Sequence, residues 1–147
     1  MPGTVLRHAF HVPAPPPVVL AHLSEPSNYV GLSPLVVAVR DVRREPGKMR
    51  FVAVERFRFF GFAKYDNLIE VTLRATEDGI EGEVDSPGGV RLDYRFGLTA
   101  DGMGTAVEDV LTVYARLGPV LRYAVRKARQ VQVARADILV GRAPTLT

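Results

Sequence analysis

The sequence predicts one α+β domain over residues 1–147, in which a curved antiparallel sheet packs against a long C-terminal helix. Two observations lead to this class. Gly118 to Val140 is the only long segment with helical periodicity. The chain before it instead alternates apolar and polar residues in short runs that are separated by turn-forming residues, as antiparallel strands do. The length is sufficient for a single domain with a sizeable core.

The predicted C-terminal helix has an apolar face that is rich in alanine. At about 100° per residue, one arc collects its apolar side chains. That arc contains Val120, Leu121, Ala124, Ala128, Val131, Ile138 and Leu139. Gly118-Pro119 marks the start, while Gly141 and Pro144 mark the end. Because alanines fill little space and Arg135 falls in the same arc, we expect room between the helix and the sheet.

The segment before this helix is predicted to contain two short helices and seven strands. A strand from Thr4 to Val12 ends at a proline cluster, and a short helix at Pro16–Leu23 follows it. Ser24–Pro34 is a second short helix or a loop. The remaining strands are expected at Leu35–Arg44, Lys48–Phe59, Phe62–Thr76, Ile80–Asp85, Val90–Ala100 and Thr105–Arg116. Glycine-containing turns separate them.

The alternation within the strands predicts which side chains face the helix. A hairpin centred on Gly61 would pair Phe57 with Tyr65 and Glu55 with Asn67, so two polar residues in apolar rows become neighbours. A two-residue turn at Asp101-Gly102 would place Asp109 opposite Tyr94. A bulge at Gly104 would instead turn Glu108 inward.

This inner surface is mostly apolar and aromatic with a few polar groups, which is typical of a small-molecule cavity. The predicted ligand-binding residues are Tyr29, Phe51, Glu55, Phe57, Tyr65, Asn67, Ile69, Tyr94, Phe96, Asp109, Leu111, Ala124, Ala128, Val131 and Arg135. The alternative is a filled core in which Arg135 forms a structural ion pair with Asp109 or Glu55. The sequence leaves open whether Arg135 faces the cavity or such a pair.

Several functional classes are not expected from the composition. The chain has no cysteine, and His8, His11 and His22 lack metal-ligand spacing, so we predict neither a metal site nor a cofactor. The net charge is +3, and we attribute the excess of basic residues to a solvent-exposed face of the protein. No nucleic-acid partner is therefore expected.

No leader peptide and no apolar run of roughly 20 residues is visible, so a cytoplasmic monomer or homodimer is expected. The aromatic run Phe57–Phe62 leaves three further roles open. They are a gate over the ligand, a dimer contact and a tip that touches membranes transiently.

Two local motifs are similar to those of a known superfamily. The first is Leu23–Tyr29 followed by Leu32-Ser33-Pro34, and the second is Gly104–Asp109 leading to Leu117-Gly118-Pro119. With the element order, they resemble the helix-grip fold of the START and Bet v 1-like superfamily (SRPBCC), which includes polyketide cyclases and lipid-transfer proteins. The first motif is also similar to a quinone-binding, ribosome-associated branch. The chain departs from many relatives in having no tryptophan.

The resemblance implies binding or transport of a hydrophobic small molecule, such as a lipid, an isoprenoid quinone or an aromatic polyketide. The first alternative is a cyclase or aromatase in which Glu55 or Asp109 moves a proton, because burial raises the pKa of an inward carboxyl. Tyr65 or Tyr94 would then hold a substrate oxygen. The second alternative is a protein-interaction or stress-regulatory module.

Overall fold

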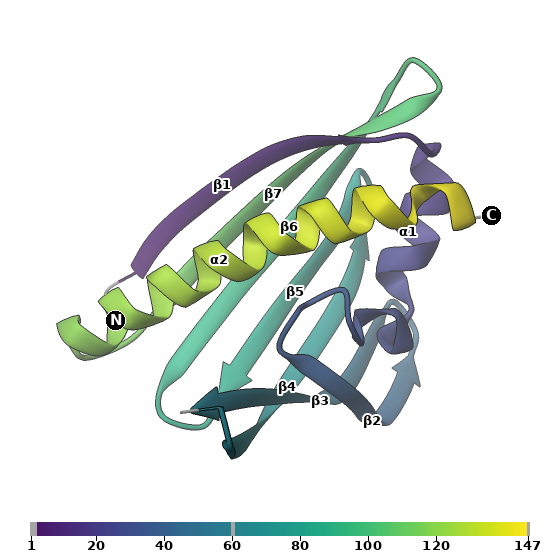
Figure 1. The fold of residues 1–147 in the computed structure, drawn as a ribbon. Helices are drawn as coiled ribbons and strands as arrows, with labels where there is room; N and C mark the ends of the chain where they lie inside the picture. The colour runs from purple at the N-terminus through teal and green to yellow at the C-terminus, as the bar shows by residue number, and fades with distance from the viewer. Residues whose placement is uncertain (1–2, 60, 147) are drawn as a thin grey trace.

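The computed structural model describes residues 3–59 and 61–146. Among them, seven strands form one antiparallel sheet in the order β1-β7-β6-β5-β4-β3-β2. The strands are β1 (Gly3–Val12), β2 (Val36–Glu45), β3 (Lys48–Phe59), β4 (Ala63–Thr76), β5 (Gly79–Ser86), β6 (Val90–Asp101) and β7 (Gly104–Tyr114). The helices are α1 (Pro16–Ser24), the 3₁₀ helix η1 (Pro26–Tyr29), α2 (Gly118–Arg142) and the 3₁₀ helix η2 (Ala143–Thr145). Figure 1 shows the sheet curving around α2.

The predicted α+β architecture is confirmed, including the two short helices after the first strand. The predicted end of the long helix was wrong: α2 does not stop at Gly141 but runs on to Arg142 and directly into η2. A glycine ends a helix by taking a left-handed conformation, and Gly141 does not adopt a positive φ. Within the described residues, no helix is both long enough and apolar enough to cross a bilayer.

Of the two predicted hairpin registers, that of β3 and β4 is confirmed and that of β6 and β7 was wrong. Around Gly61, Glu55 pairs with Asn67 and Phe57 with Tyr65, as predicted. In the β6–β7 hairpin, Asp101 pairs with Gly104, so the turn residues are Gly102 and Met103. Gly102 has a φ of 62° there, which glycine adopts without strain.

The register of β6 and β7 is therefore shifted by two residues from the prediction. Asp109 lies opposite Phe96 rather than Tyr94, and Tyr94 lies opposite Leu111. Because side chains alternate with a period of two, the inward face is unchanged. Glu108 points outward, where it pairs with Arg7 at 3.0 Å.

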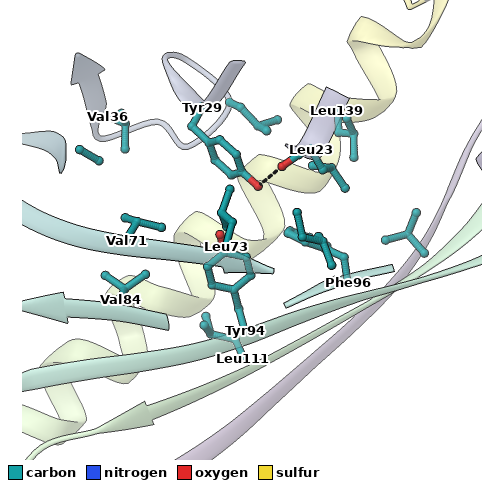
Figure 2. Close-up of a cluster of buried hydrophobic side chains, with 14 of the residues drawn as sticks. Leu23, Tyr29, Val36, Val71, Leu73, Val84, Tyr94, Phe96, Leu111 and Leu139 are labelled. Carbon is teal, nitrogen blue, oxygen red and sulfur yellow. Dashed lines mark hydrogen bonds between the residues drawn. The ribbon is translucent and has the colours of Figure 1, made fainter. Parts of the chain in front are cut away.

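The apolar core occupies the end of the molecule where α1, η1 and the C-terminal half of α2 meet the sheet. Figure 2 shows Leu23 of α1 and Leu139 of α2 close to Phe96 of β6, and all three are essentially inaccessible to solvent. The buried residues of α2 begin at Ala128, whereas Val120 and Ala124 nearer its N-terminus are only half-buried. The N-terminal half of α2 therefore covers a less completely filled space.

A buried glutamine fastens α2 to the sheet. The Gln132 side chain is fully buried, and its Nε2 donates to the carbonyl oxygens of Leu6 at 3.2 Å and Asp109 at 3.1 Å. Its Oε1 accepts from Nη1 of Arg129 at 2.9 Å. One side chain thus joins α2 to both β1 and β7.

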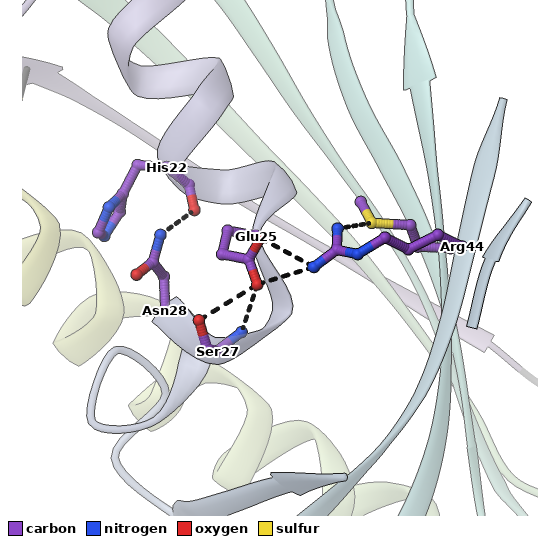
Figure 3. A network of polar contacts seen from close by, with 6 residues as sticks. His22, Glu25, Ser27, Asn28 and Arg44 are labelled. Carbon is purple, nitrogen blue, oxygen red and sulfur yellow. Dashed lines mark hydrogen bonds and ion pairs between the residues drawn. The ribbon is translucent and has the colours of Figure 1, made fainter. Parts of the chain in front are cut away.

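The segment after α1 is tied to both sides of the fold. Figure 3 shows Arg44 of β2 reaching the Glu25 carboxylate, at 3.2 and 3.1 Å to its two oxygens. On the other side, Arg142 at the end of α2 donates to the carbonyl oxygens of Asn28 at 2.7 Å and Val30 at 3.0 Å. These contacts fix η1, which carries Tyr29, relative to the sheet and to α2.

Replacing Gln132 by leucine should lower the free energy of unfolding by about 1 to 3 kcal/mol, because two carbonyl groups inside the protein would lose their side-chain donor. Urea denaturation followed by circular dichroism measures the change. Gln130→Leu is the matched control, since Gln130 is exposed on the same helix. Equal stabilities of the two variants would contradict the anchoring role of Gln132.

Candidate functional site

A cavity of about 420 Å³ lies between the inner face of the sheet and the N-terminal half of α2. Its walls are mostly apolar, with Phe51, Ile69 and Val71 on the sheet side and Ala124 and Ala128 on the helix side. The alanines leave the space that larger side chains would fill. The volume is in the range of small-molecule binding sites.

Most of the predicted ligand-binding residues line this cavity. They are Tyr29, Phe51, Glu55, Phe57, Tyr65, Asn67, Ile69, Tyr94, Leu111, Ala124, Ala128, Val131 and Arg135. Phe96 and Asp109 do not: each is 1% exposed and lies behind the lining. Asp109 is covered by Arg135, so of the two candidate catalytic carboxyl groups only Glu55 faces the cavity.

The structure adds lining residues that were not among the predicted ligand-binding residues. Val84, Ser86 and Leu92 line the sheet side, while Tyr123 and Lys127 line the edge of α2. Lys127 lies three residues after Ala124 and four before Val131, so helical spacing places it beside both. A wider arc would have included it.

The aromatic run divides at the hairpin tip. Phe57 lines the cavity and Phe62 is 83% exposed, while Phe60 lies outside the described residues. The gate, dimer and membrane roles of this run stay predictions.

The inner end of the cavity holds a buried ion pair. Nη2 of Arg135 donates to Oδ2 of Asp109 at 2.7 Å, and the two side chains are 9% and 1% exposed. The guanidinium carbon lies 4.8 Å from the ring centre of Phe96 and 5.7 Å from that of Tyr94. Arg135 thus does both things that the sequence had left open, because it pairs with Asp109 and also lines the cavity.

Two buried tyrosines continue this polar end. The Tyr29 hydroxyl donates to the carbonyl oxygen of Leu23 at 2.7 Å (Figure 2), and the Tyr29 and Tyr94 rings both line the cavity. Burial raises the pKa of Tyr29 to about 12, with the neighbouring Tyr94 hydroxyl opposing the shift. Burial also raises the pKa of Tyr94 well above its usual range. Both phenols therefore stay neutral at physiological pH.

The position of Tyr94 depends on a glycine in the neighbouring strand. Gly82 lies directly opposite Tyr94 in the β5–β6 pair. A Cβ atom at Gly82 would collide with the Tyr94 ring, including its hydroxyl end. The glycine therefore lets the ring lie across β5.

A second polar group sits on the β3–β4 wall. Nδ2 of Asn67 donates to Oγ of Ser86 at 3.1 Å and to Oε1 of Glu55 at 3.5 Å. Burial raises the pKa of Glu55, and the contact with Asn67 opposes this shift only in part. Glu55 is thus a carboxyl group able to hold a proton inside an otherwise apolar wall.

The described residues contain no group of three or more histidine, aspartate or glutamate side chains placed to hold a metal ion. The polar groups of the cavity are instead suited to hydrogen bonding and proton transfer. These are the guanidinium of Arg135, the two phenols and the Glu55 carboxyl.

Solved structures share this fold over nearly the whole chain. The Zhui aromatase/cyclase from Streptomyces sp. R1128 matches with a TM-score of 0.82 and 14% identity, over 97% of this chain and 94% of that one. A START superfamily protein from Mycobacterium smegmatis matches with 0.73 and 16%, over 96% and 97%. Norcoclaurine synthase from Thalictrum flavum matches with 0.63 and 13%, over 95% and 86%.

These neighbours confirm the resemblance to the START and Bet v 1-like superfamily at the level of the fold. No family model matches the sequence, and no curated protein matches it either. At such low identity the likeness does not transfer an activity, because one fold hosts many functions. The function has to be argued from the cavity.

The raised pKa of Glu55 makes the stability of the protein depend on pH in a defined direction. The fold favours the protonated form, so this contribution is present below the unfolded pKa of Glu55 and is lost as the pH rises through its folded pKa. Glu55→Gln should therefore gain stability relative to the wild type between acid and neutral pH.

Urea denaturation at several pH values measures this difference. Glu70→Gln, on an exposed position of β4, is the matched control. A stability difference between Glu55→Gln and the wild type that does not change with pH would argue against a raised pKa at Glu55.

Proposed function

We propose that this protein binds a hydrophobic small molecule between the sheet and α2, and that it stores or carries that molecule. The observation that carries the proposal is the apolar cavity of about 420 Å³. If it were dry, cavity scaling would give a cost on the order of 10 kcal/mol, which is comparable with the whole stability of a typical domain. Such a space is therefore expected to hold a ligand, water or both, and its mostly apolar walls favour an apolar ligand.

The size of the cavity sets the scale of the ligand and of its affinity. An apolar ligand that buries about 300 Å² gains roughly 7 kcal/mol before the costs of association, which corresponds to micromolar affinity or weaker. A lipid, an isoprenoid quinone or an aromatic polyketide would each meet the apolar walls. The shared fold with an aromatase/cyclase supports the polyketide class among these.

Native mass spectra of the purified protein should show a bound apolar molecule that is lost on denaturation. Ala128→Phe should reduce this occupancy about tenfold or more, because Ala128 lines the cavity and a phenyl ring would project into it. Ala21→Phe, on the exposed face of α1, is the matched control and should retain the ligand.

A protein that acts through protein contacts alone would show no adduct in any of the three samples. Lipids and quinones would then also fail to displace a neutral apolar dye such as Nile red. This combined result would overturn the binding proposal.

A cyclase or aromatase activity is the second candidate, and Glu55 is the observation that favours it. Its carboxyl lines an apolar cavity and has a raised pKa, as a general acid or base requires. Asp109 cannot take this role in the described structure because it lies behind Arg135.

If the protein is such an enzyme, Glu55→Gln should lower kcat by about 100-fold or more while ligand affinity changes little. Cyclisation of a poly-β-ketone substrate, followed by chromatography, measures the rate. Glu70→Gln serves again as the control and should keep full turnover. A wild-type protein that binds the substrate without turning it over would exclude the enzyme and leave the carrier.

A further inference from the structure

Only one partner of the ion pair at the inner end of the cavity faces the cavity. Arg135 lines the cavity, whereas Asp109 lies behind it and is 1% exposed. A guanidinium has five N–H donors, and the contact with Oδ2 of Asp109 is its one hydrogen bond among the described residues. Among the described residues, Nε of Arg135 and Oδ1 of Asp109 are both buried without a hydrogen-bond partner. Because Arg135 lines the cavity and forms this one hydrogen bond, its guanidinium retains donor capacity on the side that a ligand can reach.

The orientation of this guanidinium is fixed before a ligand arrives. It is held by Asp109 on one side and lies over the Phe96 ring at 4.8 Å. Cation–π contact and the ion pair together limit its rotation. A ligand atom that accepts a hydrogen bond from it therefore meets a donor that needs little reordering, which is the condition for a specific contact.

The charge balance decides which acceptor fits. The positive charge of Arg135 is already neutralised by Asp109, so a ligand carboxylate would bring an unbalanced negative charge into an apolar space. Glu55 on the opposite wall adds to this disadvantage whenever it is ionised. The other cation of the lining, Lys127, is eight residues away on α2, about 12 Å along the helix axis. An uncharged carbonyl oxygen accepts the same hydrogen bond without adding charge.

We propose that the inner end of the cavity recognises an uncharged carbonyl oxygen, as in a ketone, quinone or ester, through Arg135, and that it disfavours carboxylates. This inference rests on the proposed binding function and names the chemical class of the ligand. The Arg135–Asp109 pair then offers the ligand an N–H donor, while the net charge of the pair is zero.

Three probes that share a naphthalene ring and differ in one short substituent test this selectivity on the wild-type protein. They are 2-acetylnaphthalene, 2-ethylnaphthalene and 2-naphthoate, which differ in having a neutral acceptor, no acceptor or a carboxylate. Isothermal titration at neutral pH should rank the ketone about tenfold tighter than the hydrocarbon, and the carboxylate at least tenfold weaker than the ketone. Naphthoate binding as tightly as the ketone would overturn the proposal.

The same titrations on the Asp109→Asn variant test whether the charge of Asp109 sets the preference for the ketone over the carboxylate. The asparagine retains an oxygen for Arg135 but removes the balancing charge, so naphthoate should gain at least tenfold relative to the ketone. Glu108→Gln is the matched control, because it removes one acidic charge from the next residue on the outer face of β7. An unchanged ranking in a folded Asp109→Asn variant would refute the charge-balance argument. If that variant does not fold, the wild-type ranking decides alone.

The probes also separate this inference from the function on which it rests. Equal binding of the ketone and the hydrocarbon would overturn the carbonyl contact while supporting an apolar binding site. Failure of all three probes, together with no uptake of Nile red, would overturn both.

Discussion

The attachment of α2 to the β1–β7 edge of the sheet determines the shape of this molecule. Gln132 holds α2 to the carbonyl groups of Leu6 and Asp109, and Arg135 reaches the Asp109 side chain one turn later. The helix thus packs directly on β1 and β7. The sheet curves away beneath it towards β3 and β4, and the small side chains of Ala124 and Ala128 do not fill the gap. The cavity forms because α2 is attached to one edge of the curved sheet and its inward side chains are too small to fill the space above β3 and β4.

The fold could be predicted because each local signal agreed with the others. Gly61 and the alternation on either side of it fixed the register of β3 and β4, and with it the neighbouring positions of Glu55 and Asn67. The β6–β7 register could not be fixed in this way. Both Asp101-Gly102 and Gly102-Met103 are acceptable two-residue turns, and only the tertiary structure selects the second.

The sequence predicted which side chains of the candidate site face the helix, but not which of them are covered by other side chains. Alternation assigns Phe96 and Asp109 to the inner face correctly, yet it cannot show that Arg135 lies between Asp109 and the cavity. Gln132 escaped notice for a similar reason. A polar residue in a helix is ordinarily assigned to solvent, and only the carbonyl groups of two distant strands explain why this one is buried. The burial of these residues depends on contacts between side chains and strands that are far apart in the sequence.

The polar groups of the cavity favour holding a ligand over transforming it. In an enzyme that cyclises a ketone, negative charge develops on the carbonyl oxygen, and a donor with net positive charge would stabilise it most. The Arg135–Asp109 pair lacks that net charge, so an enolate would meet the same disadvantage as a carboxylate. The tyrosines stay neutral, and the Tyr29 hydroxyl already donates to the carbonyl oxygen of Leu23. A ground-state carbonyl has no such disadvantage, and this supports the proposal of a binding protein over that of a catalyst of enolate formation.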